Sequence, residues 1–194
     1  MWEKQVGSTL AFCEWSYPLW KENIPANFEN VTPEMLWQAV NQVEPSLIRV
    51  EADEATYNLH IMIRYEIEKK LINGELEVDD LPDAWDDMYD EFLGVRSPTR
   101  TKGVLQDIHW SFGAFGYFPT YTLGNLYSAQ LLQAAEKDIG NIDDQVREDN
   151  FEPLLNWMRT HVHARGSILE PADHIEEATG EQPKPDAFVA YLAD

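Results

Sequence analysis

The chain has 194 residues, of which 14 are Lys or Arg and 35 are Asp or Glu, so its formal net charge is −21. Its length suits one domain with a substantial core, and a hydrophobic content of 44% excludes a disordered acidic tail. Because a strongly negative chain repels phosphates, we expect no nucleic-acid partner and no binding to an anionic membrane. The single cysteine, Cys13, excludes an intrachain disulfide and predicts a reducing, cytoplasmic location. No apolar run approaches the length of a membrane span, and the residues after Met1 do not form an apolar secretion signal.

Most of the chain has the sequence pattern of helices. Between Glu54 and Ile72 no Gly or Pro occurs, and apolar residues recur every three or four positions. This spacing predicts one long helix, whose apolar stripe comprises Ala55, Leu59, Met62, Ile63 and Ile67. Caps, prolines and apolar spacing predict further helices that begin at Thr32 and near Pro82, and others over 150–163 and 171–178.

Signals for β-strands are scarce. The best is Ser46–Val50, which could equally be an extended entry to the long helix, and residues 95–102 are the most loop-like interior segment. No internal repeat or low-complexity linker separates parts of the chain. The fold class that we expect is therefore all-α, with residues 1–194 forming a single compact helical unit.

Residues that could ligate a metal or act as a nucleophile do not form a complete motif. Five histidines are present, and none belongs to His-Glu-x-x-His, which places two imidazoles and a Glu base together on a helix. His161 and His163 would lie about 200° apart on a helix and could not share one ion. Cys13 stands among aromatic residues and is predicted to be a small buried side chain. The residues alone thus predict no metal site.

Residues 103–127 are unusually rich in Tyr and Phe and contain no Lys or Arg. A dense aromatic wall with few polar groups is typical of a pocket lining. The alternative is a pair of core helices whose Tyr hydroxyls reach the surface. The polar groups in question are Gln106, Asp107, His109, Tyr117 and Tyr121.

Two motifs make the chain resemble a known family. Residues 103–110 match G-x-x-Q-D-x-H-W and residues 48–53 match I-R-x-x-A-D, both motifs of the carboxypeptidase Taq family of zinc metallocarboxypeptidases. The segments 51–60 and 116–121 are also similar to this family. The resemblance extends over 2–191, but corresponds to the C-terminal portion of a longer enzyme. It implies a fold that is part of a larger, mostly helical peptidase acting on the C-terminus of peptides.

The resemblance also implies that the metal ligands are absent. In the family, His-Glu-x-x-His supplies two zinc ligands and the general base, and a later motif supplies a third ligand, a Glu. That later motif runs directly into a segment that residues 2–7 match, so we expect the chain to begin just after the last ligand. We therefore expect no cofactor in this chain, zinc or another divalent metal belonging to the full-length enzyme, and no hydrolysis of peptides by the isolated chain.

By the same resemblance, His109 and Tyr117 would be the catalytic groups that this chain retains. They would lie over the zinc and donate hydrogen bonds to the oxygens that form when water adds to the peptide carbonyl. Because residues eight apart do not point the same way on a straight helix, a break near Gly113 or Gly116 would help both to face inward.

The remaining candidate residues would bind or orient the substrate. Arg49 could grip the terminal carboxylate through its planar fork, although an ion pair with Glu51, Asp53 or Asp107 is the alternative. Gln106 and Asp107 would orient their neighbours, and Asp107 could hold a ring nitrogen of a histidine. Tyr121 would line the substrate groove.

Two functional hypotheses follow. The first is the C-terminal part of a carboxypeptidase, which carries residues that bind the peptide C-terminus. The second is a non-catalytic binding module that self-associates through an exposed apolar surface. Either predicts a homo-oligomer or association with a missing N-terminal part. The acidic residues concentrate in 75–91 and 136–152, where a solvated surface explains them.

Overall fold

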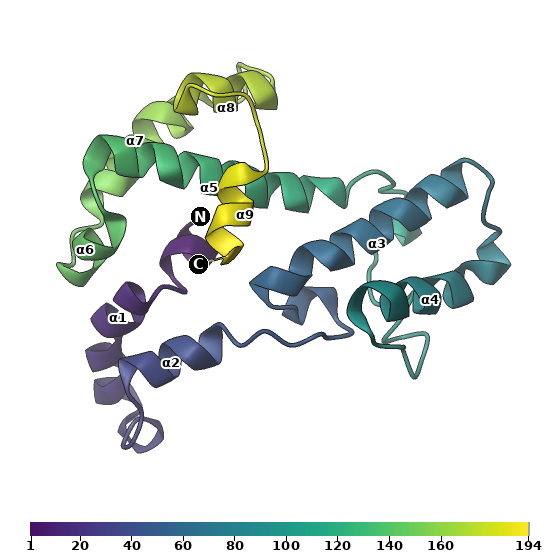
Figure 1. Ribbon diagram of the computed structural model, residues 1–194, viewed down its shortest axis with the longest axis horizontal. Coiled ribbons are helices and arrows are strands. Elements are labelled where there is room, and N and C mark those ends of the chain that lie inside the picture. Colours follow the sequence, from purple (N-terminus) through teal and green to yellow (C-terminus); the bar gives the residue numbers. More distant parts are fainter. Residues whose placement is uncertain (194) are drawn as a thin grey trace. The chain divides into compact units, whose positions relative to one another are not determined.

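The structure is a computed structural model that describes residues 1–193, and all regular elements in that range are helical (Figure 1). The α-helices are α1 (Leu10–Asn23), α2 (Pro33–Val40), α3 (Glu54–Ile72), α4 (Leu81–Leu93), α5 (Pro119–Ile139), α6 (Ile142–Arg147), α7 (Glu152–His161), α8 (Pro171–Thr179) and α9 (Asp186–Ala193). Short helical turns are η1 (Trp2–Val6), η2 (Pro25–Asn27), η3 (Arg49–Glu51), η4 (Val78–Asp80), η5 (Trp110–Phe112) and η6 (His163–Arg165). The predicted all-α class is confirmed. Among the described helices, none is both long and apolar enough to cross a membrane.

Local sequence signals set most helix ends. The Thr32 hydroxyl accepts a hydrogen bond from the Met35 amide at 3.2 Å and so caps α2. The Asp53 carboxylate accepts from the Thr56 amide at 2.9 Å and caps α3 in the same way. Gly94 is the C-cap of α4, and its φ of 68° is the left-handed conformation that glycine adopts most readily. These caps explain why the predicted start points of α2 and α3 are confirmed.

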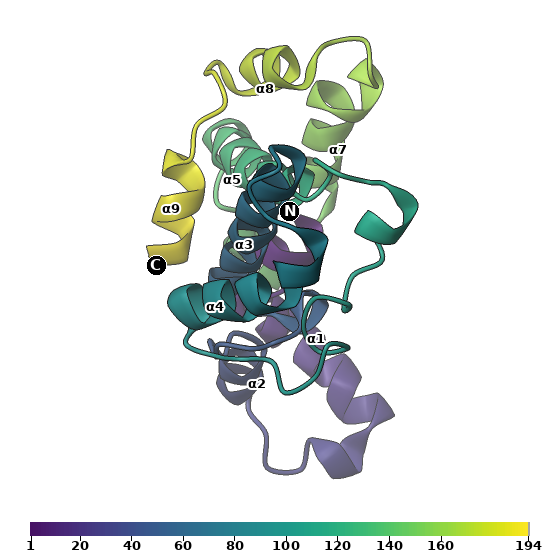
Figure 2. The same ribbon diagram turned by 90° about the vertical axis from the view of Figure 1, so that its right-hand side faces the viewer.

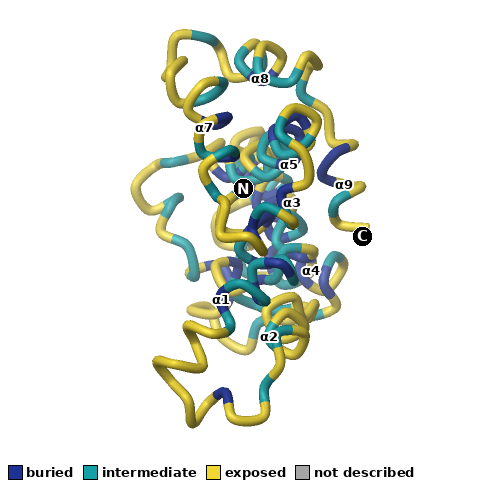
Figure 3. The backbone as a smooth tube through the Cα atoms, turned by 90° about the vertical axis from the view of Figure 1, so that its left-hand side faces the viewer, coloured by how far each residue is buried: buried dark blue, intermediate teal, exposed yellow. Residues whose placement is uncertain are grey.

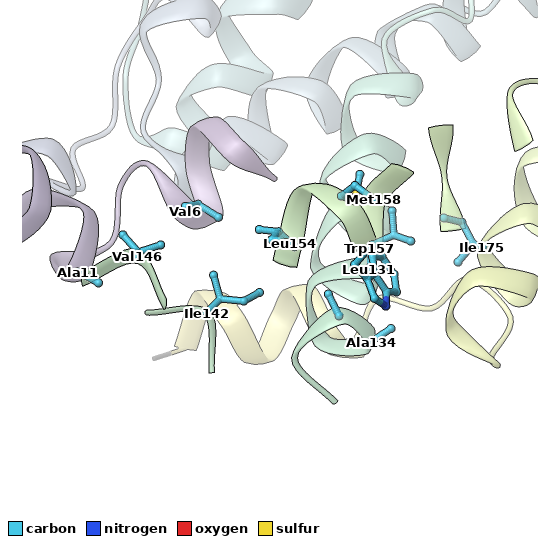
Figure 4. Close-up of a cluster of buried hydrophobic side chains, with 11 residues drawn as sticks. Val6, Ala11, Leu131, Ala134, Ile142, Val146, Leu154, Trp157, Met158 and Ile175 are labelled. Carbon is cyan, nitrogen blue, oxygen red and sulfur yellow. The ribbon is translucent and has the colours of Figure 1, made fainter. Parts of the chain in front are cut away.

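Contacts divide the described chain into two compact units, residues 42–124 and residues 1–41 together with 125–193. The expectation that residues 1–194 form one unit stays a prediction. In Figure 3 the connecting segments are mostly exposed, and the buried positions lie largely along the helices. In the unit of residues 1–41 and 125–193, apolar side chains from η1, α5, α6 and α7 form the main core (Figure 4). Cys13 is buried there, as predicted.

The unit of residues 42–124 is built on α3 and α4, which lie side by side (Figures 1 and 2). Its core comprises Ile63, Ile67, Trp85, Met88, Tyr89, Leu93 and Val104. The predicted apolar stripe of α3 is correct for Ile63 and Ile67 and wrong for Ala55 and Met62, which are exposed. The core-facing side of α3 instead includes buried polar residues.

Three further sequence expectations are settled by the structure. Ser46–Val50 contains no strand and enters α3 through an extended Ile48 and the turn η3, which is the alternative that the sequence left open. Residues 103–127 do not form a pair of core helices, because residues 103–118 make a loop around η5 before α5 begins. The helix expected over 150–163 is shorter, since Phe151 is its N-cap and α7 ends at His161.

Candidate active site

The loop of residues 103–118 carries most of the candidate residues and is shaped by two glycines. Gly113 has a φ of 82° and Gly116 a φ of 76°, both in the left-handed region that side chains with a Cβ disfavour. Gly113 ends η5, and α5 begins three residues after Gly116, at Pro119. The predicted break between His109 and Tyr117 is therefore present.

This loop brings His109, Tyr117 and Tyr121 together. The Nε2 atom of His109 lies 3.1 Å from the Tyr121 hydroxyl. The centroid of the His109 ring lies 5.5 Å from that of Tyr117 and 4.5 Å from that of Phe118. Tyr117 is 48% exposed, whereas the His109 side chain is mostly buried. A histidine and two phenols thus share one aromatic cluster that opens to solvent at Tyr117.

A buried ion pair joins the two family motifs. The Arg49 guanidinium donates from Nε and Nη2 to Oδ1 of Asp107, at 3.1 and 2.6 Å. Its Nη1 donates to the Tyr57 hydroxyl at 3.0 Å. Of the alternatives for Arg49, the structure shows the ion pair with Asp107. These contacts show how the Arg49 guanidinium is held. Its role in binding a substrate carboxylate stays a prediction.

Arg64 is the principal site residue that sequence reasoning missed. Its side chain is 0% exposed, and its Nε donates to Oδ2 of Asp107 at 2.7 Å. Its Nη2 donates to the Gln106 side-chain oxygen at 2.9 Å, and its Nη1 donates to the Tyr89 hydroxyl at 3.0 Å. A charged residue next to the apolar stripe was a usable signal, because a fully buried arginine needs an anionic partner elsewhere in the fold.

Gln106 connects the same groups through its amide. Its oxygen accepts from the Arg49 backbone amide at 2.9 Å as well as from Arg64. Its nitrogen donates to the carbonyl oxygens of Leu47 at 2.8 Å and Lys102 at 3.1 Å. Gln106 therefore joins the segment that precedes α3 to the loop, and the orienting role expected of it stays a prediction.

The expectation that Asp107 holds a histidine ring is wrong for its neighbour His109. The distance from Oδ1 of Asp107 to Nδ1 of His109 is 3.9 Å, too long for a hydrogen bond. Both Asp107 oxygens are occupied by arginines instead. Within residues 1–193, Nδ1 of His109 is buried without a hydrogen-bond partner.

The electrostatics of the cluster follow from burial and charge. Burial raises the pKa of the Asp107 carboxyl, but the hydrogen bond from Arg49 and the charge of Arg64 outweigh it, so this pKa lies below its ordinary value. Burial lowers the pKa of Arg49, and its contacts with Asp107 more than compensate. Asp107 and Arg49 are therefore both charged at neutral pH. Two guanidinium groups therefore share one carboxylate, and the formal charges of Arg49, Arg64 and Asp107 sum to +1.

Buried His60 borders this cluster and stays neutral. Its Nδ1 lies 2.9 Å from the Tyr89 hydroxyl. Burial, and then the positive charges of Arg64 and Arg49, lower the pKa of His60 to about 4. Aromatic rings enclose the cations: the guanidinium carbon of Arg49 lies 5.6 Å from the ring centroid of Phe118, and that of Arg64 lies 5.3 Å from the same ring.

The described residues do not fit a catalytic metal. In residues 1–193, no group of three or more His, Cys, Asp or Glu side chains is placed to hold an ion. The Asp107 oxygens face guanidinium groups, and Nε2 of His174 lies 3.0 Å from the carbonyl oxygen of His161. The geometry thus defines a helical protein with a buried, aromatic-lined cluster of two arginines and one aspartate.

The chain is similar to known carboxypeptidases. A family model described as carboxypeptidase Taq (M32) metallopeptidase matches residues 1–194. Thermostable carboxypeptidase 1 of Thermus thermophilus is 49% identical over 191 residues, which cover 98% of this chain and 37% of that protein. Carboxypeptidase 1 of Bacillus subtilis is 40% identical over 193 residues, which cover 100% of this chain and 38% of that protein. The M32 carboxypeptidase structure from Deinococcus radiodurans R1 superposes with a TM-score of 0.95 at 40% identity, covering 98% of this chain and 39% of that chain.

The chain therefore belongs to the carboxypeptidase Taq (M32) metallopeptidase family. It spans 37% and 38% of the lengths of the Thermus and Bacillus relatives.

Proposed function

We propose that this chain forms the part of a metallocarboxypeptidase that binds the C-terminal carboxylate of a peptide. The observation that carries the proposal is the charge of the buried cluster, in which Arg49 and Arg64 share the single carboxylate of Asp107. A buried charge without a counter-ion is costly, so the cluster favours a second anion. A peptide C-terminus supplies an anion of the right size and planarity.

Arg49 is the member of the cluster that meets this anion. Its side chain is 6% exposed, whereas that of Arg64 is 0% exposed and has no access to a ligand. The hydrogen bonds of Arg49 to Asp107 and Tyr57 engage three of its five N–H donors. The remaining donors belong to the planar fork that pairs with a carboxylate.

His109, Tyr117 and Tyr121 would act on the peptide bond next to that carboxylate. Tyr117 and His109 lie side by side, and the Tyr121 hydroxyl fixes the orientation of the His109 ring. A donor that stabilises negative charge on the reacting carbonyl oxygen lowers the barrier by roughly 3 kcal/mol. In this proposal His109 and Tyr117 supply such donors, and Tyr121 keeps the His109 ring in place.

The metal of the reaction would be held by the part of the enzyme that this chain does not match. The proposal therefore predicts that the isolated chain, supplied with Zn²⁺, releases no C-terminal residues from peptides. Detectable, chelator-sensitive release by the pure chain would contradict this division of roles.

Binding is tested by calorimetric titration of the chain with two forms of one short, N-terminally blocked peptide. The first form has a free C-terminal carboxylate, and the second has a C-terminal amide. We expect the free acid to bind at least about tenfold more tightly, because the amide cannot form the charged bidentate pair. Arg49→Gln should abolish the difference. Arg96→Gln is the matched control, since Arg96 lies on the surface of the same unit and pairs with Asp87 and Asp90. Equal affinities of wild type for acid and amide would refute the proposal.

A second candidate function is self-association, which is supported by exposed apolar side chains. Leu105, Ile108 and Phe112 are each at least 65% exposed on the loop that carries the site. Such apolar exposure favours a protein partner, and a second copy of the chain is the simplest one. Light scattering should then show a mass that rises with concentration, whereas a clean monomer at high concentration would count against association.

The buried, unpaired Cys13 is compatible with the cytoplasmic location that we propose for either function.

A further inference from the structure

Helix α3 presents four buried polar side chains at intervals of four residues: Thr56, His60, Arg64 and Glu68. This spacing places them in a row along one face of the helix. Arg64 holds Gln106 and Asp107, as described above. Glu68 is 4% exposed, and its contacts lie further along the same loop.

Glu68 binds both ends of a seven-residue turn. Its Oε1 accepts a hydrogen bond from the Trp110 indole at 2.7 Å, and its Oε2 accepts from the Gly116 backbone amide at 3.2 Å. The candidate residues stand immediately outside these anchors, because His109 precedes Trp110 and Tyr117 follows Gly116. One carboxylate therefore fixes the two points of the chain from which the His109 and Tyr117 rings extend.

We propose that Glu68 is a positioning residue that closes the turn 110–116 and thereby sets the separation of His109 and Tyr117. Glu68 would set this separation in the chain without peptide, and the importance of the separation for catalysis rests on the proposed function. Within the turn, Gly113 and Gly116 give the backbone unusual freedom, and the two hydrogen bonds to Glu68 would restrict it so that the two rings stay 5.5 Å apart.

The carboxylate suits this task in a way that an amide does not. Both of its oxygens are acceptors, and each faces one N–H donor. In Glu68→Gln, one position would carry an NH₂ group opposite a donor, so one anchor would be lost while the size of the side chain is retained. The proposal thus separates the acceptor role of Glu68 from its packing.

The experiment is NMR spectroscopy of the full chain without peptide, comparing wild type with Glu68→Gln. We expect the variant to lose the nuclear Overhauser effects between the His109 and Tyr117 rings and to exchange the Gly116 amide proton at least about tenfold faster. Glu66→Gln is the matched control, because Glu66 lies on the exposed side of α3 and pairs with Lys69. It should change neither signal.

A folded Glu68→Gln variant with unchanged ring contacts and unchanged Gly116 exchange would overturn the proposal. If that variant does not fold, Trp110→Phe removes the indole donor and keeps an aromatic ring. It should shift the His109 signals and leave Gly116 protected, and unchanged His109 signals would equally overturn the proposal. Because no peptide is present, failure here is distinct from failure of peptide binding.

Discussion

Replacing Asp107 by Asn removes the carboxylate that pairs with both buried arginines. In the wild-type protein, Oδ1 accepts from Arg49 and Oδ2 from Arg64, so the charge and both oxygens are used. The Asn side chain has nearly the same size, but it has no charge and would turn an NH₂ group toward one guanidinium. The packing is kept, and the two cations are left without their counter-ion.

The expected loss of stability follows from the burial of these groups. Breaking a buried ion pair by removing one partner costs about 3–5 kcal/mol, whereas exposed pairs contribute about 0–1 kcal/mol. Asp107 is 11% exposed, and its partners Arg49 and Arg64 are 6% and 0% exposed. We therefore expect Asp107→Asn to lower the free energy of unfolding of the unit of residues 42–124 by about 3 kcal/mol or more.

Urea unfolding followed by the indole NMR signals of Trp85 and Trp110 measures this loss in the relevant unit. Asp90→Asn is the matched control, because Asp90 lies on α4, pairs with Arg96 at 3.1 Å and is 52% exposed. The control should change the free energy of unfolding by less than about 1 kcal/mol. If Asp107→Asn cost no more than Asp90→Asn, the central role given to the buried cluster would be wrong.

The other predictions concern pH and backbone conformation. The pKa of His60 is about 4 in the folded protein and 6.5 in the unfolded chain, so the unfolded chain takes up the proton first as the pH falls. The contribution of neutral His60 to the free energy of unfolding should therefore be almost fully present above pH 6.5 and decrease by about 3 kcal/mol as the pH drops to 4. Urea midpoints across this range should fall for wild type more than for His60→Gln, and parallel profiles would contradict the assignment. Gly116→Ala should lower the free energy of unfolding by about 1 kcal/mol or more. A Cβ is strained at the φ of 76° of this residue, although no neighbour obstructs it. Gly124→Ala, within α5 and equally unobstructed, should raise stability by up to about 1 kcal/mol, and calorimetry showing the same sign for both would refute this reasoning.

Local sequence signals were sufficient for most of the helices. The ends of α3 coincide with the predicted ones because Asp53 caps its start and no Gly or Pro interrupts it before Asn73 and Gly74. A capping side chain binds a backbone amide only about three residues further along the chain, so both partners can be recognised within a short stretch of sequence. The same reasoning held for Thr32 and α2.

The site was only partly predictable, because its interactions join distant segments. Arg49 and Asp107 were both identified by the motifs, but their pairing spans 58 residues and competed with closer carboxylates. Arg64 and Glu68 were missed because charged residues on a helix are usually exposed. Their burial depends on a loop about 40 residues further along, which periodicity in α3 does not report. A search for charged residues at four-residue intervals beside Ile63 and Ile67 would have found them.

The NMR signal of the Arg49 Nε–H group tests the central claim most directly. This signal reports the environment of the guanidinium that the account assigns to the peptide carboxylate, and Arg49→Lys identifies it. A blocked peptide with a free C-terminus should shift the signal in a saturable manner, and the same peptide as its C-terminal amide should leave it in place. An Arg49 signal that responds to both peptides alike, or to neither, would contradict the assignment of this cluster to carboxylate binding.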